Sequence, residues 1–108
     1  MFQKSQQKDY NLMVSLKNLS NVEIKSRLSN RPNQPVTGEW VLIPSDGEIT
    51  WDRPASQFNY QIEIEQYRVT AKFYVPHNGH LSFLPSGTAL DKKGTPYVRH
   101  EVRSFKII

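Results

Sequence analysis

Apolar and polar residues alternate over much of this chain, which is the pattern of half-buried β-strands. The first such run lies within residues 10–17, and its apolar members share one parity: Tyr10, Leu12, Val14 and Leu16. A second run within residues 22–28 keeps that parity, with Val22, Ile24 and Leu28 on its apolar face. Residues 18–21 between the two runs predict either a turn between two strands or a bulge in one long, curved strand.

Residues 40–51 predict a β-hairpin. A continuous apolar run is followed by Ser-Asp-Gly and then by Glu-Ile-Thr-Trp, which is a strong hairpin signal. Two registers remain open. A three-residue loop with Gly47 in the left-handed conformation leaves Trp40 on the opposite face from Val41 and Trp51, whereas a two-residue turn places both tryptophans on one face. The register therefore decides which tryptophan is buried.

The segment 58–75 is long and rich in β-forming residues. Its apolar positions keep one parity at Ile62 and Ile64 and the other parity from Tyr67 onward. This slip predicts a bulge or a sharp corner near residues 65–66.

Residues 77–79, His-Asn-Gly, predict the next turn. A three-residue loop with Gly79 left-handed would place Val75 opposite Leu81 and Phe73 opposite Phe83, so that apolar residues pair with apolar residues. Residues 78–108 then predict a strand, a long basic loop and a final strand that starts near Tyr97.

The sequence therefore predicts an all-β fold. No stretch keeps a helical period of 3.6 residues, and about six strands are expected. A small Greek-key barrel of the OB-fold type suits the slipping parity and the long loop, and a β-sandwich is the alternative. Residues 1–9 are expected to form a flexible polar arm and residues 10–108 a single β-barrel domain, with loops at residues 29–37 and 54–57.

Composition narrows the class of protein. The chain has 108 residues, of which 37% are hydrophobic and 22% charged, as in a globular domain. A net charge of +4 favours an anionic partner. The absence of cysteine excludes disulfides, thiolate zinc sites and cysteine nucleophiles. With no apolar run long enough to span a membrane and no signal-peptide pattern, we expect a cytoplasmic protein without a membrane role.

Catalytic chemistry finds little support in the sequence. The histidines are His77, His80 and His100, and no carboxylate lies beside the first two in the sequence to complete a metal site. Glu63 and Glu65 alternate with isoleucines, as on a solvated strand face. We therefore expect no catalytic residue, no metal, no cofactor and no enzyme activity.

Binding to nucleic acid has more support, because basic and aromatic residues recur together. Arg68, Lys72 and Tyr74 follow one face of a predicted strand, and two lysines occupy a loop between glycines. Such a mixture provides charge for phosphates and rings for bases. The predicted nucleic-acid-binding residues are Trp40, Trp51, Arg68, Lys72, Tyr74, Lys92, Lys93, Tyr97, Arg99 and Arg103.

The last third of the chain also carries a recognisable spacing of residues. The positions concerned are Gly79, Leu81, Lys93, Gly94, Tyr97, Glu101, Val102 and Ile107. They resemble the last hairpin of bacterial single-stranded DNA-binding proteins and of the related primosomal PriB proteins. In that family a Gly-x-Leu strand leads through a Lys-x-Gly type of loop to a Tyr-x-x-x-Glu-Val strand.

The resemblance implies an OB-fold in which this loop and its strands line a DNA groove. It also implies sequence-tolerant binding of single-stranded nucleic acid, DNA above all, in support of replication, recombination or plasmid or phage maintenance. Homodimers that pair through strand edges would be expected. The alternative is a protein-interaction or structural module, such as a phage or secretion component or an enzyme inhibitor. That class would bury both tryptophans and scatter its lysines and arginines.

Overall fold

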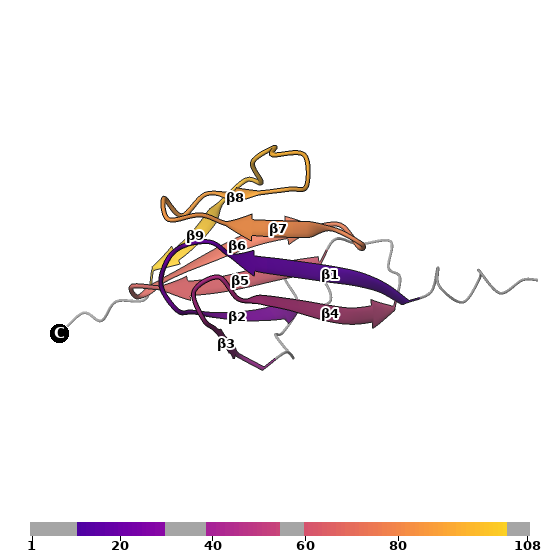
Figure 1. The fold of residues 1–108 in the computed structure, drawn as a ribbon, viewed down its shortest axis with the longest axis horizontal. Coiled ribbons are helices and arrows are strands. Elements are labelled where there is room, and N and C mark those ends of the chain that lie inside the picture. Colours follow the sequence, from indigo (N-terminus) through magenta and orange to yellow (C-terminus); the bar gives the residue numbers. More distant parts are fainter. Residues whose placement is uncertain (1–10, 30–38, 55–59, 104–108) are drawn as a thin grey trace, which may run out of the picture.

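The computed structural model describes residues 11–29, 39–54 and 60–103, which form nine strands and no helix (Figure 1). The predicted arm, and most of the two predicted loops, lie outside these residues. The strands are β1 (Asn11–Asn18), β2 (Ile24–Ser29), β3 (Val41–Ile43), β4 (Glu48–Pro54), β5 (Tyr60–Gln66), β6 (Val69–Val75), β7 (His80–Phe83), β8 (Ala89–Leu90) and β9 (His100–Arg103).

The described strands form two sheets. One has the order β4-β1-β7-β8 and the other the order β3-β2-β5-β6-β9. Figure 1 shows β1 between β4 and β7, in front of the sheet that contains β5 and β6. β1 and β7 run parallel, and the other ladders are antiparallel. The all-β prediction is confirmed, but these ladders do not close a barrel.

One hydrophobic core lies between the sheets. Residues at alternate positions along the strands face inward, and these are almost fully buried. Phe73 of β6 contacts Phe83 of β7 edge to face, with ring centroids 6.4 Å apart. Burying a large apolar side chain contributes about 1.5–3 kcal/mol. The buried apolar residues are Val14, Leu16, Ile24, Leu28, Ile43, Trp51, Tyr60, Ile62, Ile64, Ala71, Phe73, Val75, Leu81, Phe83 and Ala89.

The break between β1 and β2 is a turn that carries the chain from one sheet to the other, so the first of the two predicted alternatives is confirmed. Ile24 and Leu28 face the core as expected. Between them Ser26 also faces inward, and its buried Oγ donates a hydrogen bond to the backbone oxygen of Glu63 at 2.8 Å.

The predicted hairpin at residues 40–51 is wrong in both registers. β3 pairs with β2 and β4 pairs with β1, so the two strands belong to different sheets. The turn itself lies where expected, since the amide of Gly47 donates to the oxygen of Pro44 at 2.9 Å. Asp46, and not Gly47, takes the positive φ of 69°. The turn thus carries the chain from one sheet to the other. β3 then pairs with the longer β2, and β4 pairs with the longer β1.

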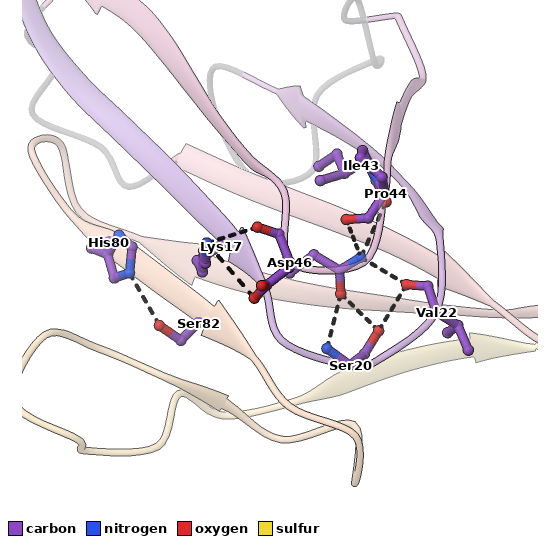
Figure 2. A network of polar contacts seen from close by, with 9 residues as sticks. Lys17, Ser20, Val22, Ile43, Pro44, Asp46, His80 and Ser82 are labelled. Carbon is purple, nitrogen blue, oxygen red and sulfur yellow. Dashed lines mark hydrogen bonds and ion pairs between the residues drawn. The ribbon is translucent and has the colours of Figure 1, made fainter.

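Asn18 ties this turn to the turn that follows β1. Its Nδ2 donates to the backbone oxygens of Val22 (2.7 Å), Pro44 (3.0 Å) and Ile43 (3.1 Å). Its Oδ1 accepts from the amide and the hydroxyl of Ser20. Figure 2 shows Ser20, Val22, Ile43 and Pro44 gathered where the two turns meet. Because Asn18 is fully buried, these bonds satisfy the donors and the acceptor of a side-chain amide that water cannot reach.

Of the two features predicted near residues 65–66, a bulge or a sharp corner, the structure has a sharp turn and an unbroken register in place of a bulge. The chain makes a two-residue hairpin turn at Tyr67 and Arg68, with φ of 54° and 67°, and Gln66 pairs with Val69 across it. Two positive φ values in a two-residue loop are the mark of a type I′ turn. The usual Asn-Gly signal is missing, so only the change of parity revealed the turn.

The predicted pairing of residues 73–75 with residues 81–83 is wrong for the same reason as the first hairpin. β7 lies in the other sheet, where Leu81 pairs with Leu16 of β1. Asn78 takes the positive φ of 62°. Gly79 is needed for space, because a Cβ there would lie 2.6 Å from Cγ1 of Val75.

The predicted long basic loop is instead two tight turns around a short strand. β8 pairs back onto β7, with Phe83 opposite Ala89. The turn between them closes at Gly87, and a second turn follows β8 at residues 91–94. The last strand, β9, then crosses to the other sheet and pairs with β6, with His100 opposite Lys72.

Candidate nucleic-acid interface

Tyr97 is the residue around which the basic and aromatic side chains gather. Its amide donates to the oxygen of Ala89 at 2.8 Å, and its hydroxyl donates to the oxygen of His80 at 2.7 Å. The ring is half-buried and packs against the core. Burial, and then the negative charge of Asp91, raise the pKa of Tyr97 above its usual value. The ring is thus held in one position with its hydroxyl protonated near neutral pH.

A first hollow of about 230 Å³ lies on one side of Tyr97. Lys92 and Lys93 line it and are exposed, whereas His80 and Asp91 line it and are half-buried. We call it the lysine hollow. Its full lining is Pro76, Gly79, His80, Asp91, Lys92, Lys93 and Tyr97.

A second hollow of about 510 Å³ shares Tyr97 as a lining residue. Tyr74 of β6 and His100 of β9 also line it, and their ring centroids lie 5.1 Å apart at a tilt of 42°. Pro96 and the exposed Val98 complete its lining. We call it the ring hollow. Tyr97 is the residue that lines both hollows, and we refer to the two hollows together as the groove, with lysines in one part and rings in the other.

Hydrogen bonds to the backbone fix the turn after β8, which carries the two lysines. Oδ1 of Asp91 accepts hydrogen bonds from the amides of Lys93 and Thr95, both at 2.8 Å. The amide of Gly94 closes the turn on the oxygen of Asp91 at 3.0 Å, and Gly94 has a φ of 87°. These hydrogen bonds fix the backbone of the turn, and both lysines are exposed.

Lys72 lies near this groove. It is half-buried on β6, two residues before Tyr74 and directly opposite His100 of β9. Alternate residues of a strand share a face, so Lys72 and Tyr74 face the same way. The structure therefore brings together five of the predicted site residues: Lys72, Tyr74, Lys92, Lys93 and Tyr97.

Arg99 is close to the groove but is held by the protein itself. Its Nη1 donates to the oxygen of Gly87 at 2.7 Å, and its Nε forms an ion pair with Glu101 at 2.8 Å. It braces the turn between β7 and β8. Arg103 pairs through its backbone with Val69, and its side chain lies outside the described structure.

The tryptophans lie elsewhere. Trp51 is 8% exposed in the core, opposite Val14 of β1, so it cannot stack on a base. Trp40 is 38% exposed, and the guanidinium of Arg27 lies 4.2 Å from the centre of its ring. Trp40 precedes β3, and β3 and β9 are opposite edges of their sheet. The structure therefore does not bring Trp40 into the groove.

Arg27 also corrects the interpretation of Glu63 as part of a solvated strand face. Glu63 is 3% exposed, and its Oε1 accepts from Nε and Nη2 of Arg27, both at 3.0 Å. Its Oε2 accepts a hydrogen bond from the side-chain Nε2 of Gln61, which is also buried, at 2.7 Å. Glu63 thus orients the arginine that covers Trp40. Across the sheet Glu63 lies opposite Lys72 of β6, whereas Trp40 lines neither of the two hollows.

Arg68 occupies the exposed turn between β5 and β6. It lines a third hollow, of about 360 Å³, together with Leu42 and Tyr67, which are 58% and 77% exposed. This hollow contains charges of both signs and shares no lining residue with the groove.

Sequence reasoning missed the histidines and Asp91 as groove residues. His80 lies on the outer face of its sheet, where Nδ1 is 2.7 Å from Oγ of Ser15. Its Nε2 is 3.1 Å from Oγ of Ser82, as Figure 2 shows. His100 reaches the groove only because β9 pairs with β6. No local signal could have shown this, because the pairing joins distant parts of the chain.

Two further findings concern the described residues. They include no group of three or more His, Cys, Asp or Glu that could hold a metal ion. None of their secondary structure is a helix of the length and apolarity that crossing a membrane requires.

Comparison with family models, with curated proteins and with solved structures finds no significant match to this chain.

Proposed function

We propose that this protein binds single-stranded nucleic acid, DNA in particular, with little dependence on sequence. The observation that supports this most is the shared position of Tyr97 between the lysine hollow and the ring hollow. A strand that follows the groove would meet ammonium groups at one end and flat rings along the rest. The groove, and not the tryptophans, carries the proposal.

The chemistry follows from the two ends of the groove. Lys92, Lys93 and Lys72 would neutralise phosphates and release their counterions, which makes binding sensitive to salt. Tyr97, Tyr74 and His100 would stack on bases, at about 1–3 kcal/mol for each base. Stacking of this kind needs bases that are not already paired, so a duplex would gain only the phosphate contacts.

The proposal includes a role as an accessory to replication, recombination or plasmid or phage maintenance, and a homodimer, as the resemblance implies. It does not depend on a closed OB-type barrel. Any surface that aligns rings with cations can track a single strand, and here two packed sheets would provide it.

The first test is the anisotropy of a fluorescently labelled oligo(dT), titrated with the protein at several salt concentrations. We expect the logarithm of the association constant to fall with the logarithm of salt concentration, with a slope of about −2 for three phosphate contacts. Labelled duplex DNA of the same length is the control and should bind more weakly. An absence of binding to either probe at low salt would sink the proposal.

A protein-interaction module is the second candidate, and the third hollow favours it. Exposed Leu42 and Tyr67 next to mixed charges are typical of a protein-binding surface. The same titration separates the candidates, since this class of protein would not bind the oligonucleotide.

A further inference from the structure

The lysine hollow contains one residue that does not suit a simple phosphate site. Asp91 lines it together with the two lysines and Tyr97. A carboxylate repels a phosphate, and no ion pair within 4.0 Å joins Asp91 to a lysine among the described residues. The hollow is therefore better suited to a base than to a phosphate, with the lysines contacting the backbone outside it.

Asp91 is also held in place before any ligand arrives. Its Oδ1 is occupied by the amides of Lys93 and Thr95. Its Oδ2 accepts no hydrogen bond from any part of the chain that the structure describes. One carboxylate oxygen thus fixes the side chain, and the other keeps its capacity to accept a hydrogen bond.

Asp91 and Tyr97 line the same hollow, so the carboxylate and the ring face one space. A base stacked on the ring of Tyr97 would therefore present its edge to Asp91. An ionised carboxylate can only accept hydrogen bonds, so it distinguishes bases by the donors on that edge.

We propose that Asp91 gives this otherwise sequence-tolerant groove a local preference for bases with an exocyclic amino group, and so for cytosine over thymine and uracil. The inference rests on the proposed function and gives it a substrate class. Cytosine offers its N4 amino group as a donor, whereas the corresponding O4 of thymine is an acceptor that the carboxylate repels. The two pyrimidines are similar in size, so a difference between them reports the edge contact.

The test compares binding of labelled oligo(dC) and oligo(dT) near neutral pH and at constant salt. We expect oligo(dC) to bind about tenfold more tightly, the effect of one hydrogen bond to a charged group. Equal binding of the two oligonucleotides would overturn the inference and leave the proposed function intact. Binding of neither would overturn both.

The variant Asp91→Asn sharpens the test. Asparagine keeps an oxygen for the amides of Lys93 and Thr95 but places an NH₂ donor where Oδ2 was. The preference should therefore reverse in favour of oligo(dT), whose O4 accepts. A general increase in affinity with an unchanged ratio would show that Asp91 acts only through its charge, and would contradict the inference.

Glu23→Gln is the matched control. Glu23 is exposed and is not a lining residue of the groove, and the substitution changes the net charge by the same amount. The ratio of the two affinities should stay as in the wild type. Thermal unfolding of each variant shows whether the fold is preserved.

Discussion

At the scale of single residues, the buried side chain of Asn18 stabilises the fold through hydrogen bonds to two turns. Its five hydrogen bonds join the turn after β1 to the turn before β4. Asn18→Ala would remove all five of these bonds, including the buried one to the oxygen of Ile43, and would create a small cavity. We expect the free energy of unfolding to fall by about 2–4 kcal/mol, measured by urea denaturation.

Asn18→Asp separates the shape of the side chain from its donors. The carboxylate has the same size, but it would turn an oxygen toward the backbone carbonyls that Nδ2 now serves. Near neutral pH this variant should be at least as unstable as Asn18→Ala. A stability equal to that of the wild type would show that packing, and not donation, matters at this position.

Tyr97 allows its ring and its hydroxyl to be tested separately. Tyr97→Phe keeps the ring and loses the bond to the oxygen of His80, so stability should fall by about 1 kcal/mol while affinity for oligo(dT) changes little. Tyr97→Leu removes the ring, and we expect affinity to fall about 5- to 100-fold. Equal affinity of the two variants would mean that no base stacks on this ring.

At the scale of elements, the turn after β8 carries the salt dependence of binding. Replacing Lys92 or Lys93 by alanine should flatten the slope of log affinity against log salt by about 0.7 for each lost phosphate contact. Lys25→Ala is the control, because it removes the same charge and Lys25 is not a lining residue of the groove. Nζ of Lys25 lies 3.9 Å from Oε1 of Glu65. A slope that changes equally in all three variants would point to net charge alone.

Substitutions in the turn between β5 and β6 should stabilise the protein without changing the groove. Tyr67 and Arg68 both hold positive φ, a conformation that suits asparagine and glycine. The double change Tyr67→Asn and Arg68→Gly should raise stability by about 1–2 kcal/mol, read from the urea midpoint. Affinity for oligo(dT) should be unchanged, and a loss of affinity would assign Arg68 a role in binding.

The sequence predicts the burial of side chains in these elements better than it predicts which strands pair. Alternation reports which side chains are buried, and Leu16, Ile62 and Phe73 face the core as expected. It does not report the partner strand, because a strand alternates in the same way in either sheet. The residues Asp46-Gly47 likewise mark a turn, but a turn that crosses the core uses the same residues as a hairpin.

The candidate site shows the same limit. Lys92 and Lys93 could be predicted, since a lysine pair between glycines is visible in the sequence. Tyr74 and His100 come together only through the pairing of β6 with β9, which joins residues far apart in the chain. Trp51 was a candidate because a tryptophan in a strand looks the same whether it faces the core or the solvent.

At the scale of the whole molecule, the raised pKa of Tyr97 links stability to alkaline pH. The folded state keeps the phenol proton more firmly than the unfolded state, whose pKa is near 10.0. The stabilisation is therefore complete below that pH and is lost as pH rises through the folded pKa. Urea denaturation should show a steeper loss of stability above pH 10.0 for the wild type than for Tyr97→Phe. Parallel curves would contradict this.

The place of β1 has a consequence for the order of folding. This strand is made before the other described strands, yet its two neighbours are β4 and the much later β7. Its sheet cannot be completed until residues 80–83 have left the ribosome, whereas β5 and β6 can pair with each other as soon as their short turn is made. Pairings between distant segments are slow to form, so β1 should wait as an unprotected strand. Pulse-labelling by hydrogen exchange during refolding should show protection of β5 and β6 before protection of β1.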